Sequence, residues 1–175
     1  VELIKNINAD AVLLAEPNQR WADNLAELKT FYKYEVSHLL ENHYGMMFFS
    51  NLEIHDTEIQ FIIQEDIPSI HTQIRLRSGD DIAFHGVHPR PPVPEEKGRS
   101  IERDGELLLV GKGVRESNLP CIVAGDMNDA AWSQSTKLFK RISGLLDPRV
   151  GRGFYNTFHA KYWIFRLPLD HVFHS

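Results

Sequence analysis

Three apolar runs in this chain end in side chains that could act as acids, bases or metal ligands. The run AVLLA is followed by Glu16, the run CIVAG by Asp126 and Asn128, and the segment PL by Asp170. His88 follows a fourth such segment, IAFHGV. Carboxylate, amide and imidazole groups are costly to bury without partners, so their position at the ends of apolar runs needs a reason.

Each of these residues has a structural interpretation as well as a functional one. Glu16 precedes Pro17 and could be an exposed turn residue, and Asp126 follows Gly125 and could start an Asx turn. Asp170 could accept hydrogen bonds from a neighbouring segment. Their joint occurrence at separate strand ends favours a functional site, because ligands gather where loops leave a sheet.

The chemistry of such a site follows from the residue types. A hard divalent cation rests on one or two carboxylates, with water and substrate phosphate completing its shell, and Glu16 suits that role. Asp126 could activate or orient a water, and Asn128 could donate to a phosphoryl oxygen. If the extended strand continues, the D-x-N spacing predicts that both face the same side while Met127 packs away from it.

Two H-x-x-H pairs, His85 with His88 and His171 with His174, invite comparison with zinc sites. Three-residue spacing on a strand places the two rings on opposite faces, and no thiolate ligands accompany them, so zinc is disfavoured. The same alternation separates Asp170 from His171. We expect His171 to be a packed or solvent-facing residue rather than the partner of Asp170 in a catalytic dyad.

The composition indicates a globular domain and narrows its function. The chain has 175 residues, 42% hydrophobic and 25% charged, which fits a single domain over residues 1–175. A net charge of −5 argues against sequence-independent coating of DNA but leaves room for an acidic, metal-holding site. The single cysteine, Cys121, lies in an apolar run and is expected to pack rather than to act as a nucleophile. No apolar run reaches the length of a membrane span, about 20 residues, and no signal-peptide pattern is present.

The order of expected elements predicts an α/β layered sandwich, in which helices cover sheets. Helices are expected at residues 1–8, 21–31, 102–115 and 133–143. Strands are expected at residues 11–15, 45–49, 58–64, 69–76, 82–87, 121–124 and 167–174, and those at 58–64 and 69–76 should pair antiparallel.

A proline-rich, charged loop is expected at residues 89–98. It can be read as a stiff surface loop beside the site, or as a polyproline segment at residues 89–94 that binds a protein partner. Arg90, Arg99 and Arg103 lie near it and could meet phosphate.

Four motifs together resemble the endonuclease/exonuclease/phosphatase superfamily: AEP at Glu16, HPRP at His88, AGDMND around Asp126 and PLDHVF around Asp170. This superfamily includes deoxyribonucleases, abasic-site endonucleases, sphingomyelinases and inositol-polyphosphate phosphatases. The resemblance implies a four-layered α/β sandwich of two mixed β-sheets flanked by helices.

The resemblance also implies a role for each candidate residue. Glu16 matches the residue that binds Mg²⁺ or Mn²⁺, Asp126 the catalytic aspartate, and Asn128 the phosphate-binding asparagine. His88 matches a strand-end histidine that contacts phosphate. Asp170 matches an aspartate that orients the histidine of a later Ser-Asp-His motif.

Two parts of the family pattern lie outside this sequence: a first strand ending in Asn, and the Ser-Asp-His motif with the strand after it. We therefore expect residues 1–175 to be a fragment trimmed at both ends and close to inactive alone. Similar bacterial proteins often carry this domain after membrane-spanning helices, so the compartment stays unknown, and we expect no membrane contact from this segment itself.

The activity implied is metal-dependent hydrolysis of a phosphodiester or a phosphomonoester. The substrate class stays open between nucleic acid, a phospholipid head group and an inositol phosphate. The alternative is a non-catalytic module that keeps the same sandwich and binds a phosphorylated ligand or a protein.

Overall fold

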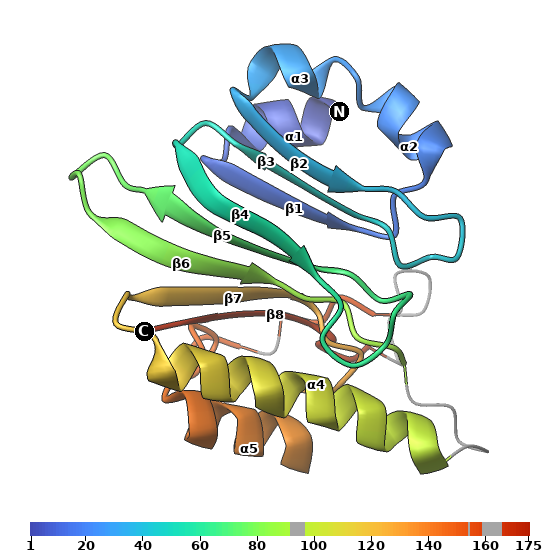
Figure 1. Ribbon diagram of the computed structural model, residues 1–175, viewed down its shortest axis with the longest axis vertical. Helices are drawn as coiled ribbons and strands as arrows, with labels where there is room; N and C mark the ends of the chain where they lie inside the picture. Colours follow the sequence, from blue (N-terminus) through green and yellow to red (C-terminus); the bar gives the residue numbers. More distant parts are fainter. Residues whose placement is uncertain (92–96, 154, 159–165) are drawn as a thin grey trace.

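The computed structural model describes residues 1–91, 97–153, 155–158 and 166–175, with the backbone alone at residues 97–100. The described part forms two stacked sheets (Figure 1). The first has the strand order β1-β3-β2, with β1 at Ala11–Ala15, β2 at Tyr34–His38 and β3 at Met46–Ser50. The second has the order β4-β5-β6-β7-β8, with strands at Ile54–Gln60, Ser69–Arg75, Asp81–Gly86, Cys121–Asp126 and Asp170–His174.

Helices lie on the two outer faces of this pair of sheets (Figure 1). Helices α1 (Glu2–Ile7), α2 (Gln19–Asn24) and α3 (Leu28–Phe31) cover the first sheet, and α4 (Lys97–Glu116) and α5 (Gln134–Ser143) cover the second. The predicted four-layered sandwich is confirmed. One detail differs: β1 and β2 both pair antiparallel with β3, so the first sheet is not mixed.

Strand β3 shows how the layers are held together. Its alternating side chains are all buried: Met47 and Phe49 pack against the helices of the first sheet, and Met46 and Phe48 face the second sheet. Phe48 stacks on Phe84 of β6 with ring centroids 4.5 Å apart. A strand buried on both faces reads as a continuous apolar run, which explains the sequence MMFF.

The pairing of β6, β7 and β8 brings three strand ends to the same edge. Strands β6 and β7 are parallel, with α4 in the connection between them, and β7 and β8 are antiparallel. In this register Gly86 lies opposite Ala124, and Asp126 lies opposite Asp170. The end of β6, the end of β7 and the start of β8 therefore meet. Helices α4 and α5 pack behind these strands, where Leu107 and Phe139 of the helices belong to one core cluster with Val123 of β7 and Phe173 of β8.

Several predicted boundaries were wrong. The helix predicted at residues 21–31 is two short helices, because Asn18 caps α2 by accepting from the Trp21 amide and the helix ends at Leu25. Trp21 is exposed rather than on the same buried face as Leu25 and Leu28. The strand predicted at 58–64 lies at Ile54–Gln60, although its antiparallel pairing with β5 is confirmed.

Other elements were missed or misplaced. Strand β2 at Tyr34–His38 was not predicted, although its sequence YEVSH alternates apolar and polar residues as far as Ser37, because the run is short and has only two apolar residues. Helix α4 begins at Lys97 rather than Glu102, so the expected loop to residue 98 is shorter. The last strand begins at Asp170 rather than Leu167. Residues 92–96 of the proline-rich segment lie outside the described residues.

A pair of histidines lies on the helix-facing side of β5 and β6. The Nδ1 atoms of His71 and His85 are 2.6 Å apart, and His71 Nε2 is 2.8 Å from the Ser69 hydroxyl. Burial lowers the pKa of His71 to about 4, and the neighbouring His85 adds to this effect. Both rings are therefore neutral in the folded protein near pH 7.

We predict that His71 makes the fold sensitive to acid. Its pKa is about 4 when folded, against 6.5 for the ordinary value, so the unfolded chain binds more protons between these values. The stability that neutral His71 contributes is complete above pH 6.5 and is lost as the pH falls toward 4. Between pH 7.5 and 5 this loss amounts to about 2 kcal/mol of unfolding free energy. Buried Glu106, with a pKa raised to about 7, acts in the opposite direction.

The test is to measure the unfolding of wild type and of His71→Gln by urea at pH 7.5 and at pH 5. The difference between the two proteins in unfolding free energy should change by about 2 kcal/mol between pH 7.5 and 5. An unchanged difference would show that His71 titrates normally in the folded state.

Candidate active site

Four of the residues predicted from the sequence come together at one end of the two sheets. Glu16 directly follows β1, His88 lies two residues beyond β6, Asp126 ends β7 and Asp170 begins β8. The charges of the other three residues act on the carboxyl group of Asp126. Burial raises the pKa of Asp126, His88 opposes this rise, and the negative charges of Asp170 and Glu16 add to it. Such coupling requires the groups to be near neighbours.

Asp126 and Asn128 form a turn rather than a continuing strand. Asn128 has φ 49°, and its backbone N–H donates to Asp126 Oδ1 at 2.8 Å. The Asn128 side-chain amide donates to the Pro89 carbonyl at 2.9 Å. The condition of the sequence prediction, that the extended strand continues to Asn128, is not met, because the chain turns after Asp126 at the Asx-type hydrogen bond. Met127 is buried in the core behind the turn, as predicted.

Gly125 permits the close approach of β6 and β7 at the site. It has φ 147°, and a Cβ atom there would lie 1.8 Å from the carbonyl oxygen of Val87. The Val87 amide donates to the Ala124 carbonyl at 2.9 Å, which fixes this approach. A side chain at position 125 would push the two strand ends apart, and with them His88 and Asp126.

His88 joins two parts of the site. Only 2% of its surface is exposed, and its Nδ1 lies 3.1 Å from the Asp126 carbonyl oxygen. Because a carbonyl only accepts, Nδ1 carries the proton and Nε2 faces Glu16, whose Oε1 is 3.7 Å away. The His88 ring also packs against Tyr44, with ring centroids 5.6 Å apart.

Glu16 is a solvent-exposed carboxylate at the end of β1. Its side chain is 55% exposed, and its backbone has φ 66°. The Glu16 amide donates to the Gly45 carbonyl at 2.9 Å, which holds this turn against the chain before β3. The residue thus extends from a fixed backbone into solvent beside His88, an arrangement open to a ligand.

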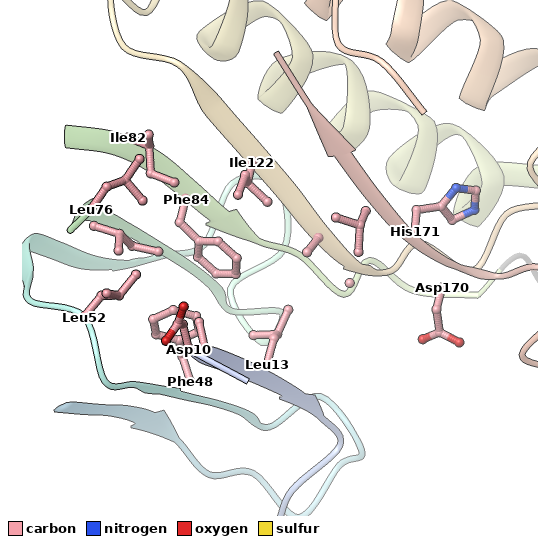
Figure 2. Close-up of a pocket in the computed structure, with 15 residues that line it drawn as sticks. Asp10, Leu13, Phe48, Leu52, Leu76, Ile82, Phe84, Ile122, Asp170 and His171 are labelled. Carbon is pink, nitrogen blue, oxygen red and sulfur yellow. The ribbon is translucent and has the colours of Figure 1, made fainter. Parts of the chain in front are cut away.

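Asp170 and His171 project to opposite sides of β8 (Figure 2). Asp170 is exposed at the site, whereas His171 is buried and stacks on Phe173. The His171 Nδ1 lies 2.7 Å from an Arg149 nitrogen, and its Nε2 lies 2.8 Å from the Asp129 carbonyl oxygen. Arginine only donates, so Nδ1 accepts and Nε2 carries the proton. His171 is a packed residue, as expected, and it does not pair with Asp170.

Two of the three arginines proposed to meet phosphate already have protein partners. Arg90 pairs with Asp66 and lies over the Tyr44 ring, 5.4 Å from its centroid. Arg103 is buried and donates to the Asn128 carbonyl at 2.9 Å and to Asp104. The side chain of Arg99 lies outside the described residues. Sequence reasoning missed the structural role of Arg103 because its partner lies 25 residues away.

A cavity of about 470 Å³ lies between the sheets next to the site (Figure 2). Its wall is mostly apolar and includes Leu13, Phe48, Phe84 and Ile122, while Gly125 and Asp170 line the end that adjoins the site. Asp10, which pairs with Arg77, also lines the cavity, so its wall is not entirely apolar.

The residues at the strand ends fit a hard divalent cation in chemical type. Glu16, Asp126 and Asp170 supply carboxylate oxygens, which Mg²⁺ and Mn²⁺ prefer. Within the described ranges no three His, Cys, Asp or Glu residues are close enough to form a ready cluster of ligands. Mg²⁺ needs no such cluster, because it is commonly held by one or two carboxylates together with water and phosphate.

Comparison with known proteins places this arrangement in a family. The sequence matches the endonuclease/exonuclease/phosphatase family over residues 1–175. The chain belongs to this family. A search of curated proteins finds no significant sequence match. Membership of the endonuclease/exonuclease/phosphatase family supports phosphoesterase activity in general terms.

Solved structures share the fold at low sequence identity. The chain is similar to D. rerio TDP2 complexed with a single-strand DNA product, with a TM-score of 0.79 and 16% identity over 99% of this chain and 74% of that one. It is also similar to the human Nocturnin catalytic domain with bound sulfate, with a TM-score of 0.75 and 17% identity over 99% of this chain and 72% of that one. The fold is shared as well by a β-hairpin deletion mutant of Staphylococcus aureus beta toxin, with a TM-score of 0.71 and 15% identity over 94% of this chain and 73% of that one. In the described part of this family member, no helix is long and apolar enough to cross a membrane.

We predict that Gly125→Ala strongly destabilises this family member, whereas Gly79→Ala does so mildly. Both glycines have positive φ, but a Cβ at Gly79 meets nothing within 4 Å. Gly79→Ala should cost about 1–2 kcal/mol of unfolding free energy from backbone strain. Gly125→Ala should add the collision with Val87 and exceed that loss by at least about 2 kcal/mol. Chemical denaturation of both variants measures the difference, and equal losses would argue against the close approach.

Proposed function

We propose that this protein is a Mg²⁺- or Mn²⁺-dependent phosphoesterase that hydrolyses a phosphodiester or a phosphomonoester. The observation that carries the proposal is the meeting of four polar groups at the strand ends. Asp126 lies opposite Asp170 in the register of β7 and β8, and His88, which donates to the Asp126 carbonyl, lies 3.7 Å from Glu16. A half-buried carboxyl whose pKa is raised by burial, among several polar groups at strand ends, is typical of a catalytic position.

Glu16 is the residue proposed to hold the metal. Its side chain extends into solvent from a backbone fixed by Gly45, so a bound ion could keep its water ligands and accept a substrate oxygen. When bound, such an ion stabilises negative charge on the phosphoryl and leaving-group oxygens. The neighbouring Nε2 of His88 faces the same space, and when this nitrogen also carries a proton it is proposed to donate to the phosphate.

Asp126 is proposed to orient and activate the attacking water. Its Oδ1 accepts the Asn128 amide, and among the described residues Oδ2 has no hydrogen-bond partner, which leaves it to accept from water. One hydrogen of the Asn128 side-chain amide is bound to the Pro89 carbonyl. The second hydrogen is available to donate to a phosphoryl oxygen.

Asp170 is proposed to orient a general acid–base histidine, as the family resemblance implies. Its carboxylate points away from His171 and toward the side of the first sheet (Figure 2). Within residues 1–175, His171 cannot serve as its partner, because its ring lies on the other side of β8. The histidine would belong to a Ser-Asp-His motif outside this sequence.

The substrate class is a choice among phosphate esters. The D. rerio TDP2 structure contains a single-strand DNA product, which supports testing nucleic-acid phosphodiesters first. A phospholipid head group and an inositol phosphate are the comparison substrates. A non-catalytic binding module would bind such compounds without hydrolysing any of them.

We predict that Asp126→Ala lowers metal-dependent hydrolysis of bis(p-nitrophenyl) phosphate by at least about 100-fold in the full-length parent protein. The matched control is Glu58→Gln, which removes an exposed carboxylate on β4 and should retain the activity of wild type. Equal rates for Asp126→Ala and wild type would exclude the role proposed for Asp126.

We predict that Glu16→Gln weakens Mn²⁺ binding by at least about tenfold, measured by calorimetry, because the amide lacks the charge of the carboxylate. Glu58→Gln again serves as the control and should bind Mn²⁺ like wild type. Failure of the wild type to bind Mg²⁺ or Mn²⁺ would favour the non-catalytic binding module.

A further inference from the structure

A layer of buried polar residues lies directly behind the candidate site, on the helix-facing side of the second sheet. The buried polar layer consists of Arg103, Asp129, Asp147, Arg149 and His171. None of these residues is assigned a role in the chemistry proposed above. Buried charged groups are costly unless their hydrogen bonds are satisfied, so the contacts that satisfy them indicate what the layer does.

Asp147 fixes the guanidinium of Arg149 in one orientation. Arg149 Nε and one terminal nitrogen donate to the two Asp147 oxygens at 2.9 and 3.0 Å, and the Arg149 backbone N–H donates to Oδ1 at 3.0 Å. The Asp147 side chain is only 5% exposed. Burial raises the pKa of Asp147, but the hydrogen bonds from Arg149 outweigh this effect and hold the pKa below its usual value. A bidentate, buried pair of this kind is rigid.

The remaining donors of Arg149 reach the strand that carries Asp170. One terminal nitrogen donates to the Asp170 carbonyl at 3.2 Å, and the other lies 2.7 Å from His171 Nδ1. Burial lowers the pKa of His171, and Arg149 lowers it further, so the ring stays neutral. The backbone at the first residue of β8 is thus fixed from behind.

His171 transmits this arrangement to the turn after β7. Its Nε2–H donates to the Asp129 carbonyl at 2.8 Å, one residue beyond Asn128. Arg103 donates to the Asn128 carbonyl at 2.9 Å, and Thr136 and Ser133 donate to Asp129 Oδ2. The carbonyls of Asn128, Asp129 and Asp170 are therefore all held by the same buried polar layer.

We propose that Arg149 is a positioning residue, which acts through His171 to fix the Asp126–Asn128 turn and Asp170 relative to each other. The inference rests on the proposed phosphoesterase function. Asp170 and the turn lie on different strands, and their side-chain directions follow from the backbone carbonyls that the layer holds. A misplacement of about 1 Å in a catalytic group can cost about 100-fold in rate. The loss of the hydrogen bonds that Arg149 and His171 make to these carbonyls should therefore reduce turnover.

The decisive comparison is between Arg149→Met and Arg152→Met in the full-length parent protein. Arg152 is an exposed arginine in the same loop that forms no ion pair with the described residues. Arg149→Met should lower kcat about 10- to 100-fold and change KM by less than about threefold, because Glu16 and His88 are untouched. Arg152→Met should stay within about twofold of wild type in both constants.

A second pair of variants separates positioning from packing at His171. Gln at this position keeps an N–H that can donate to the Asp129 carbonyl, whereas Leu has a similar size and no donor. We expect His171→Gln to retain most of the turnover and His171→Leu to lose at least about tenfold. This pair also carries the test if Arg149→Met does not fold. Equal turnover in His171→Gln and His171→Leu would overturn the role of His171.

Backbone amide NMR makes the outcome independent of activity. The amide signals of residues 126–129 and 170 should shift in Arg149→Met and stay in place in Arg152→Met. If the wild type shows no metal-dependent hydrolysis, the proposed function fails, and these shifts still decide the positioning role. Unchanged signals in Arg149→Met, with kcat equal to that of Arg152→Met where hydrolysis is measured, would overturn the proposal.

Discussion

The contact between the Gly125 backbone and the Val87 carbonyl is the constraint on which the rest of the site depends. The parallel strands β6 and β7 approach so closely at their ends that a Cβ at position 125 would lie 1.8 Å from that oxygen. This approach brings His88 over the Asp126 carbonyl and lets the Asn128 amide reach Pro89. Glycine is required because it alone combines φ 147° with the absence of a side chain.

The polar groups around this contact are satisfied largely through backbone atoms. His88 and Asn128 each bond to a carbonyl of the opposite strand end, and the buried polar layer bonds to the carbonyls of the next turn and of β8. Because these hydrogen bonds go to the backbone, none of them uses the carboxylate of Asp126 or Asp170, and among the described residues the Asp126 carboxylate accepts only from the Asn128 backbone N–H. The result is a hydrogen-bonded frame around two acidic groups at the strand ends.

Much of the fold could be predicted from the sequence where apolar patterning was strong. Strand β1 was predicted with its observed boundaries, and β3, β5, β6, β7 and α5 were predicted within one residue at their starts. Strand β2 was missed because its alternating run is short and has only two apolar residues. The helix at residues 21–31 was predicted as one because the apolar spacing of Trp21, Leu25 and Leu28 does not reveal the end of α2 at Asn24. The candidate site residues were proposed because polar groups stood out against apolar runs.

The sequence by itself determined which residues stand at the strand ends and that Gly125 precedes the acidic turn. Only the tertiary structure decided how they face one another, because direction depends on hydrogen bonds between segments far apart in the chain. Asn128 leaves the strand geometry when its amide bonds to Asp126, and Arg103 is drawn away from solvent by a carbonyl 25 residues later. Arg149 showed no signal in the sequence, since its role exists only once β8, the turn after β7 and the loop at Asp147 have packed together.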